Sequence, residues 1–269
     1  MAVTVKTPQE IKLLREGGRR LAAILHKIAA SAHPGISTWE LDQRAERLIL
    51  ESGGVPAFKG YRVREARSAY PSSICTSLND EVVHAIPREG RFLKEGDIIG
   101  LDIGMRWPMT GVGDKRRERY GGLVTDMALT IGIGKISSDA ERLIRATREA
   151  LDIGIGAARP GRRVGDIGDA ISAHLKKGHF GIVRDLAGHG VGYELHEEPL
   201  IPNYGRPGTG PELREGMVIA IEPMATLGGE EIVLDDDEWT FRTADGSLAA
   251  HFEHTIAITG DGAQILTAL

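Results

Sequence analysis

The spacing of apolar side chains predicts a long first helix. Apolar or small residues recur at steps of three and four, at Ile11, Leu14, Gly18, Leu21, Leu25 and Ile28. This spacing places them on one buried face of a helix. The residues Thr7-Pro8-Gln9-Glu10 form a capping box with proline at the first helical position, which predicts where the helix begins. We expect it to end before His33-Pro34-Gly35.

The remaining apolar pattern predicts three more helices and two groups of strands. The helices are expected from near Thr38 to Gly53-Gly54, over 138–158 and over 164–177, the last two separated by Pro160-Gly161. Strands are expected between 55 and 134, most clearly at 97–103 and 123–133, and again over 182–259. The order is therefore helix, helix, strands, repeated once, which predicts an α+β fold.

The two halves also resemble each other in sequence. His84-Ala85-Ile86-Pro87 corresponds to His196-Glu197-Glu198-Pro199, and the segment from Leu93 to Asp102 corresponds to that from Leu213 to Glu222. Weaker correspondences join Pro34-Gly35 to Pro160-Gly161, and 125–131 to 252–258. The order is the same and the offsets are all close to about 120 residues, which indicates an internal duplication. We expect one domain over 1–269, built from units at roughly 7–134 and 138–259.

Composition and charge exclude several classes of protein. The chain is 41% hydrophobic and 26% charged, as in ordinary globular proteins, and its net charge of −5 argues against a surface that coats DNA. Its one cysteine, Cys75, allows neither an internal disulfide nor a cysteine-rich zinc site. No apolar run is long enough for a membrane span or a signal peptide. These features predict a cytoplasmic protein without a membrane partner.

Four acidic residues lie in apolar strand segments, where they are costly to bury. In the strand at 97–104, Asp102 shares one face with Gly100 and Gly104, and Glu222 shares a face with Ala220 in the same way. Asp126 and Glu253 lie in two further apolar runs. A strand-end cap or a salt bridge would explain any one of them. Four acids in two symmetric pairs favour a shared metal site.

Histidines and glycines add to this pattern. His189 lies in the glycine-rich stretch Gly188-His189-Gly190-Val191-Gly192, and we expect the glycines to allow close backbone contacts and to place the imidazole rings on loops. His84 and His196 form the symmetric pair, whereas His254 points away from its neighbour Glu253 and is not expected to be a ligand. Ordinary structural roles are expected for His26, His33, His174 and His179.

The charges of the four carboxylates balance those of two divalent cations. With one imidazole and no thiolate, such a site suits Mn²⁺, Fe²⁺ or Co²⁺ as well as Zn²⁺. Two metal ions with shared ligands can produce a nucleophile from water at neutral pH. The residues therefore predict a dinuclear hydrolase.

At this point the chain resembles a known family, the type I methionine aminopeptidases of the pita-bread-fold metallopeptidases. The resemblance covers nearly the whole chain and rests on 79–87, 96–102, Thr125-Asp126, 188–192, 195–199, 221–224 and 252–255. It implies a pita-bread fold with two pseudo-twofold-related halves around a central antiparallel sheet. The implied metal ligands are Asp102, Asp126, His189, Glu222 and Glu253, which are the residues already selected by charge.

The resemblance also implies roles for these residues. Asp126 and Glu253 would bridge both metals, Asp102 would bind one, and His189 and Glu222 the other. A bridging hydroxide would attack the first peptide carbonyl, with Glu222 as proton shuttle and His84 and His196 as hydrogen-bond donors to the scissile group. The implied methionine pocket comprises Tyr70, Cys75, His84, Leu195 and Trp239, and His196 is implied to bind substrate as well.

The implied function is removal of the N-terminal methionine from nascent proteins and peptides, preferentially before a small second residue. The implied partners are the N-termini of nascent chains at the ribosome, and we expect a monomer. One alternative is a proline-directed aminopeptidase or dipeptidase of the same fold, although such enzymes usually carry an additional N-terminal domain. A second alternative is a non-catalytic binding relative, although such relatives typically lack metal ligands and none is missing here.

Several segments depart from the family pattern. Leu195 stands where the family usually has phenylalanine, and Lys59–Ser68 and Met105–Tyr120 are read as insertions. The charged stretch Asp114–Arg119 is interpreted as a solvated loop, with a basic patch that touches ribosomal RNA as the alternative. The acidic run Asp235–Glu238 is interpreted as a solvated turn rather than a cation site.

Overall fold

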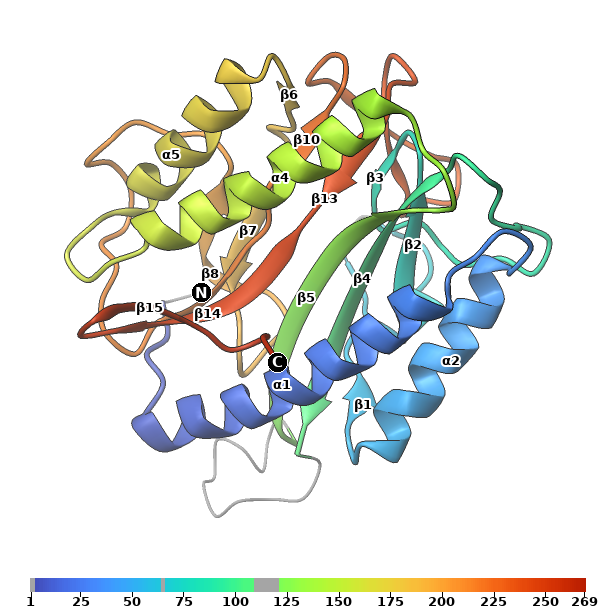
Figure 1. The fold of residues 1–269 in the computed structure, drawn as a ribbon. Helices are drawn as coiled ribbons and strands as arrows, with labels where there is room; N and C mark the ends of the chain where they lie inside the picture. The colour runs from blue at the N-terminus through green and yellow to red at the C-terminus, as the bar shows by residue number, and fades with distance from the viewer. Residues whose placement is uncertain (1–2, 64–65, 109–120) are drawn as a thin grey trace.

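A curved antiparallel sheet of nine strands forms the centre of the structure (Figure 1). The computed structural model describes residues 3–63, 66–108 and 121–269. The main path of the sheet runs through β1 (Val55–Pro56), β4 (Ile98–Trp107), β5 (Leu123–Gly132), β14 (Glu253–Thr259), β9 (Val218–Ile221), β7 (Ala187–Gly190) and β8 (Glu197–Pro202). Off this path, β2 (Ile74–Leu78) pairs with β4, and β15 (Gly262–Ile265) pairs with β14.

Two small sheets of three strands extend the central one. The first joins β13 (Ala249–His251), β10 (Met224–Thr226) and β6 (Gly181–Ile182). The second joins β11 (Ile232–Leu234), β12 (Phe241–Thr243) and β3 (Glu81–Val83). Both matter for the site described below, because β13 precedes Glu253 and β3 precedes His84.

The four predicted helices are confirmed within one or two residues at each end. They are α1 (Pro8–Ser31), α2 (Thr38–Glu51), α4 (Ser138–Ala157) and α5 (Val164–Lys177). In α1 the Thr7 side chain accepts a hydrogen bond from the Glu10 backbone, and the Glu10 carboxylate accepts one from the Thr7 backbone. Ser37 and Glu40 form the same reciprocal capping box at the start of α2. Such caps satisfy backbone donors that the helix itself leaves unpaired.

The helices cover one face of the central sheet and leave the opposite face free for polar groups. α1 packs against β4 and β5, and α4 packs against β9, β13 and β14 (Figure 1). Alternate strand residues such as Leu101 and Leu129 join helix residues such as Leu25 in one buried core. Each such buried side chain contributes about 1.5–3 kcal/mol. Because side chains alternate along a strand, Asp102 and Asp126 face away from this core.

The strands β5 and β14 meet in the middle of the sheet, where one threonine hydroxyl joins them and a second joins β5 to β13. Backbone register between the strands covers only Glu253 opposite Ala128 and His254 opposite Met127. Beyond this short ladder, the Thr255 hydroxyl accepts a hydrogen bond from the Asp126 N–H (2.9 Å) and donates one to the Asp126 carbonyl (2.8 Å). The Thr130 hydroxyl makes the same two bonds, at the same distances, to the backbone of His251.

The predicted α+β architecture, with two helix-helix-strand halves about a central antiparallel sheet, is confirmed. The domain assignment and the duplication boundaries stay predictions. The strand predicted at 97–103 was too short, because β4 continues to Trp107, where Leu123 of β5 still pairs with it. Met105–Trp107 is therefore strand rather than insertion, whereas the stretch Asp114–Arg119 lies outside the described residues. No described helix has the length and apolar character needed to span a membrane.

Candidate active site

The strand register brings three carboxylates together on the helix-free face of the sheet. Asp102 on β4 lies opposite Ala128 on β5, and Glu253 on β14 lies opposite the same Ala128 from the other side. Asp126 precedes Ala128 by two residues and therefore shares its face. The methyl group of Ala128 leaves room between the longer acidic side chains.

Glu222 reaches the same place from a break between two strands. It follows β9 and precedes β10, and the next residue, Pro223, has no N–H to offer a strand ladder. The Asn203 side-chain amide donates a hydrogen bond to the Glu222 carbonyl (3.0 Å) and so holds the backbone at this break. The Glu222 Oε1 atom lies 3.6 Å from Nε2 of His189.

His189 lies on strand β7 rather than on a loop, so that part of the sequence interpretation is wrong. The expected close backbone contacts are confirmed, because a Cβ at Gly188 would overlap the Ala220 carbonyl and one at Gly190 would overlap the Glu198 carbonyl. β8 and β9 pair with this short strand on its two sides, and the register with β8 shifts between Gly188 and Gly190, at His189. The His189 Nδ1–H donates to the Gly190 carbonyl (2.9 Å), which leaves Nε2 free to act as an acceptor.

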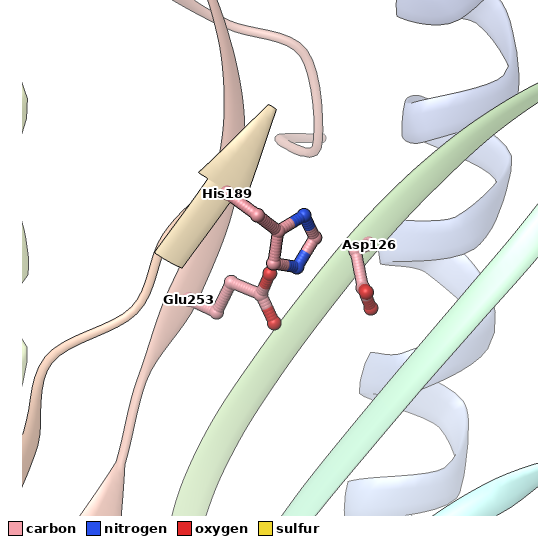
Figure 2. Close-up of side chains that lie close together, drawn as sticks. All are labelled: Asp126, His189 and Glu253. Atoms are coloured by element: carbon pink, nitrogen blue, oxygen red, sulfur yellow. The ribbon is translucent and has the colours of Figure 1, made fainter. Parts of the chain in front are cut away.

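One oxygen or nitrogen atom from each of Asp126, His189 and Glu253 lies within 4.8 Å of the others. Figure 2 shows these three side chains converging from β5, β7 and β14. The three residues are buried. Their close approach is the geometry that a metal ion requires of its ligands.

The negative charge of the four carboxylates has no nearby positive side chain in the described part of the chain to balance it, and bound cations would supply that balance. Among the described residues, no lysine or arginine pairs with Asp102, Asp126, Glu222 or Glu253, and Oδ1 of Asp102 and Oε1 of Glu253 are buried without a hydrogen-bond partner. Burial and neighbouring carboxylates raise the pKa of Asp126 to about 7, and burial raises the pKa of Glu222 to about 8. The same two causes place the pKa values of the other two acids well above their usual range.

His189 is suited to metal binding at neutral pH for the opposite reason. Burial lowers its pKa to about 4, so that its imidazole is neutral and carries a lone pair. Oxygen donors from carboxylates together with one neutral imidazole fit divalent transition-metal ions. The residues present therefore fit a divalent metal ion, and the number of ions stays a prediction.

A cavity of about 270 Å³ opens over these residues. Every residue that the sequence analysis assigned to catalysis, metal binding or the methionine pocket contributes to its wall. Six further wall residues were not foreseen: Phe58, Tyr61, Val63, Leu234, Glu238 and Phe241. Tyr61 and Val63 lie in the segment Lys59–Ser68, which the sequence analysis read as an insertion. Glu238 adjoins Trp239, which was selected.

The two symmetric histidines reach the cavity by different routes. His84 follows β3, adopts a left-handed backbone conformation with φ of 61°, and packs its ring edge-on against Phe241. His196 immediately precedes β8, and its Nδ1 lies 2.6 Å from the Tyr61 hydroxyl. Burial and nearby histidines lower the pKa of His84 to about 3. Burial, together with the neighbouring His189, lowers the pKa of His196 to about 3.

A soft apolar pocket adjoins the carboxylates. Tyr70 and Trp239 pack edge-on with ring centroids 5.2 Å apart, and the buried Cys75 lies opposite Asp102 in the strand register. Leu195 is buried in the same cluster. Cys75, Asp102, Ala128 and Glu253 therefore form a single row across β2, β4, β5 and β14.

A buried ion pair holds the segment that carries His196. Nζ of Lys6 lies 2.7 Å from the Glu197 carboxylate, whose other oxygen accepts a hydrogen bond from the Tyr193 N–H (2.6 Å). Burial lowers the pKa of Lys6, and the nearby lysine lowers that of Glu197. The N-terminal segment thus fixes the residue next to His196, a long-range contact that no local pattern could reveal.

The acidic run Asp235–Glu238 forms a turn, as predicted, but it is not simply solvated. Asp235 pairs with Arg242 (2.6 Å), Asp237 with Arg88 (3.1 Å) and Glu238 with Arg67 (3.0 Å). Asp237 also accepts the backbone N–H of Trp239 (3.0 Å). These contacts fix the turn that presents Trp239 to the cavity.

Comparison with known proteins identifies what the chain is similar to. The family model for metallopeptidase family M24 matches residues 12–260. A methionine aminopeptidase from Aquifex aeolicus is 43% identical over 100% of both chains. Methionine aminopeptidase 1 from Bacillus subtilis is 44% identical over 98% of this chain and 99% of its own length.

Solved structures agree with these sequence matches. A methionine aminopeptidase crystal structure from Thermotoga maritima superimposes with a TM-score of 0.90 at 39% identity, with both chains covered completely. A prolidase from Pyrococcus furiosus reaches a TM-score of 0.72 at 22% identity, with 98% of this chain and 65% of that chain covered. The predicted pita-bread fold and the resemblance stated from sequence are confirmed.

Proposed function

The chain belongs to metallopeptidase family M24, and from this premise we propose that it is a methionine aminopeptidase that removes the first residue of nascent proteins and peptides. One observation carries the proposal. Four carboxylates, three of them buried and Glu222 partly buried, have no lysine or arginine partner among the described residues and line one cavity with His189, beside a pocket of soft apolar side chains. The full-length relatives that bear this name support it.

The proposed metal ligands are Asp102, Asp126, His189, Glu222 and Glu253. Two divalent cations, drawn from Mn²⁺, Fe²⁺, Co²⁺ or Zn²⁺, would neutralise the four carboxylates and supply water activation at neutral pH. The raised pKa values of Asp126 and Glu222 support this assignment, because each signals a carboxylate that lacks a compensating charge.

The remaining cavity residues are proposed to bind and orient the peptide. Tyr70, Cys75, Leu195 and Trp239 form a polarisable wall suited to a thioether side chain. His84 and His196, which are neutral at pH 7, would each offer an N–H to the scissile carbonyl oxygen as negative charge develops there. Glu222, with a pKa of about 8 before metal is bound, is placed to accept and return a proton.

A proline-directed peptidase of the same fold is the alternative that remains. The prolidase likeness stands at 22% identity and therefore bears on the fold alone. That match leaves about a third of the prolidase chain uncovered, whereas the methionine aminopeptidase matches span both partners. Full-length agreement favours the methionine-specific activity.

A peptide assay tests the proposal. Metal-free protein is reconstituted with each of the four cations and offered Met-Ala-Ser, Met-Leu-Ser and Ala-Pro. We expect methionine release from Met-Ala-Ser, slower release before the larger leucine, and no cleavage of Ala-Pro. Preferential cleavage of Ala-Pro would overturn the assignment.

The variant Glu222→Gln tests the role of Glu222, because it keeps the size of the side chain but removes both its charge as a metal ligand and its ability to carry the proton. We expect turnover to fall by about 10²–10⁴. Turnover close to that of the unmodified protein would contradict the proton role.

A further inference from the structure

One buried histidine beside the carboxylates has no role in the function proposed above. His251 on β13 is 3% exposed, and its Nε2 atom has no hydrogen-bond partner. That nitrogen lies 3.4 Å from Oε2 of Glu222. A buried polar atom without a partner is costly, so its position requires an explanation.

The backbone of His251 is held from two sides. The Thr130 hydroxyl bonds both its N–H and its carbonyl, and the residue pairs with Met224 of β10, two positions beyond Glu222. These contacts fix the distance between the His251 ring and the strand break that carries Glu222. His251 also precedes Glu253 by two residues, so the alternation of side chains points both toward the same face.

Glu222 is therefore flanked by two imidazoles, one at each oxygen. Oε1 lies 3.6 Å from Nε2 of His189, and Oε2 lies 3.4 Å from Nε2 of His251. The two rings differ in one respect. His189 lies within 4.8 Å of Asp126 and Glu253 as a candidate ligand, whereas His251 is not part of that group.

A neutral imidazole carries one N–H and one lone pair. When Glu222 is ionised, its Oε2 can only accept, so a small rotation of the ring that aligns Nε2–H with Oε2 would satisfy both groups. The same contact turns the other oxygen of Glu222 toward His189.

We propose that His251 is a positioning residue for Glu222: its Nε2–H donates to Oε2 and fixes the rotation of that carboxylate toward the metal pair. The inference rests on the proposed function only in taking Glu222 as a metal ligand and proton carrier. Outer hydrogen bonds of this kind orient a ligand before the metal binds.

Two substitutions separate the hydrogen bond from simple packing. His251→Leu keeps much of the volume and removes the donor, whereas His251→Gln keeps an N–H donor near the place of Nε2. His254→Leu is the matched control, because His254 is the neighbour of Glu253 on the other side and bonds Thr267 instead (2.9 Å).

The first readout needs no peptide. Calorimetric titration of metal-free protein with Mn²⁺ should show a loss of affinity of about 10- to 100-fold for His251→Leu and near-normal affinity for His251→Gln and His254→Leu. Equal affinity in His251→Leu and the unmodified protein would overturn the proposal. So would a loss in His251→Gln, or in His254→Leu, as large as that in His251→Leu.

The second readout is the tautomer of the ring. Nitrogen-15 spectra of selectively labelled, metal-free protein should show His251 protonated at Nε2, and protonation at Nδ1 alone would contradict the assignment. With Met-Ala-Ser, His251→Leu should lower kcat more than it raises KM. If the unmodified protein cleaves no methionyl peptide, the proposed function fails while the titration and the spectra still decide the role of His251.

Discussion

At the scale of single residues, contacts hold both the ring and the backbone of His196 in place. Its ring faces the Tyr61 hydroxyl at 2.6 Å and lies edge-on to His189, with ring centroids 4.3 Å apart. Its backbone is fixed through Glu197, which the buried Lys6 holds. When the tyrosine O–H donates to Nδ1, the proton of the imidazole is kept on Nε2, the nitrogen available to a substrate.

The substitution Tyr61→Phe tests this contact. It removes the hydroxyl and keeps the ring, so kcat should fall about tenfold while the melting temperature hardly changes. Steady-state kinetics on Met-Ala-Ser would measure the effect, with Tyr204→Phe as control because that ring packs against Arg184 on the surface. An unchanged kcat in Tyr61→Phe would show that His196 needs no fixed tautomer.

The acidic residues that line the cavity could be selected from sequence because each breaks an apolar strand pattern, while their role as ligands stays a prediction. Asp102, Asp126 and Glu253 stand out on chemistry alone, and the register then brings them together. Tyr61 could not be found in this way, since its partner His196 lies 135 positions away. His251 could have been found, because the alternation that excluded His254 as a ligand favours the residue two positions before Glu253.

At the scale of elements, the junction of β5 and β14 determines where Asp126 lies relative to Glu253. The ladder between these strands is short, and the Thr255 hydroxyl supplies two bonds to the Asp126 backbone beyond it. The side chain of one strand thus replaces missing backbone pairing in the other.

The variant Thr255→Val keeps the shape of the side chain and removes both bonds. It should lower the free energy of unfolding by about 1–3 kcal/mol, because a buried N–H and carbonyl lose their partner. Urea unfolding measures this, and a Mn²⁺ titration should show weaker binding as Asp126 shifts. Thr255→Ser retains the hydroxyl and should behave almost normally; equal losses in both variants would point to packing of the methyl group instead.

Helix boundaries were predictable because capping is local, with Thr7 and Glu10 three residues apart. Strand boundaries were less so, because they depend on distant partners. β4 is extended by pairing with β5, and β7 is a strand rather than a loop because β8 and β9 flank it. No pattern within either segment contains that information.

At the scale of the whole molecule, the carboxylate cluster makes stability depend on pH and on metal. The pKa values of Asp126 and Glu222 in the folded protein, about 7 and about 8, exceed the ordinary values near 4. Between these limits the folded state binds more protons than the unfolded chain. Its stability is therefore greatest on the acidic side of this window and falls as pH rises through the folded pKa values.

Metal-free protein should accordingly lose several degrees of melting temperature between about pH 6.5 and 8.5. The lowered pKa values of the buried histidines make stability rise with pH, but only below the ordinary histidine pKa near 6.5. Above that pH, the carboxylates determine how stability changes. Scanning calorimetry in a chelator measures the effect. Added Mn²⁺ should reverse it, with the larger gain at the higher pH. A metal-free melting temperature that rises or stays level would contradict this account.

The central row of Asp102, Ala128 and Glu253 has a consequence for how the protein folds during its own synthesis. β4 and β5 leave the ribosome early and contribute two of the four acids, whereas β9 and β14 follow more than eighty residues later. Until β14 has docked on β5, a growing copy carries only two of the four proposed carboxylate ligands. If the proposed site is correct, activity should therefore appear only in a late step, when the strand that carries Glu253 joins the sheet.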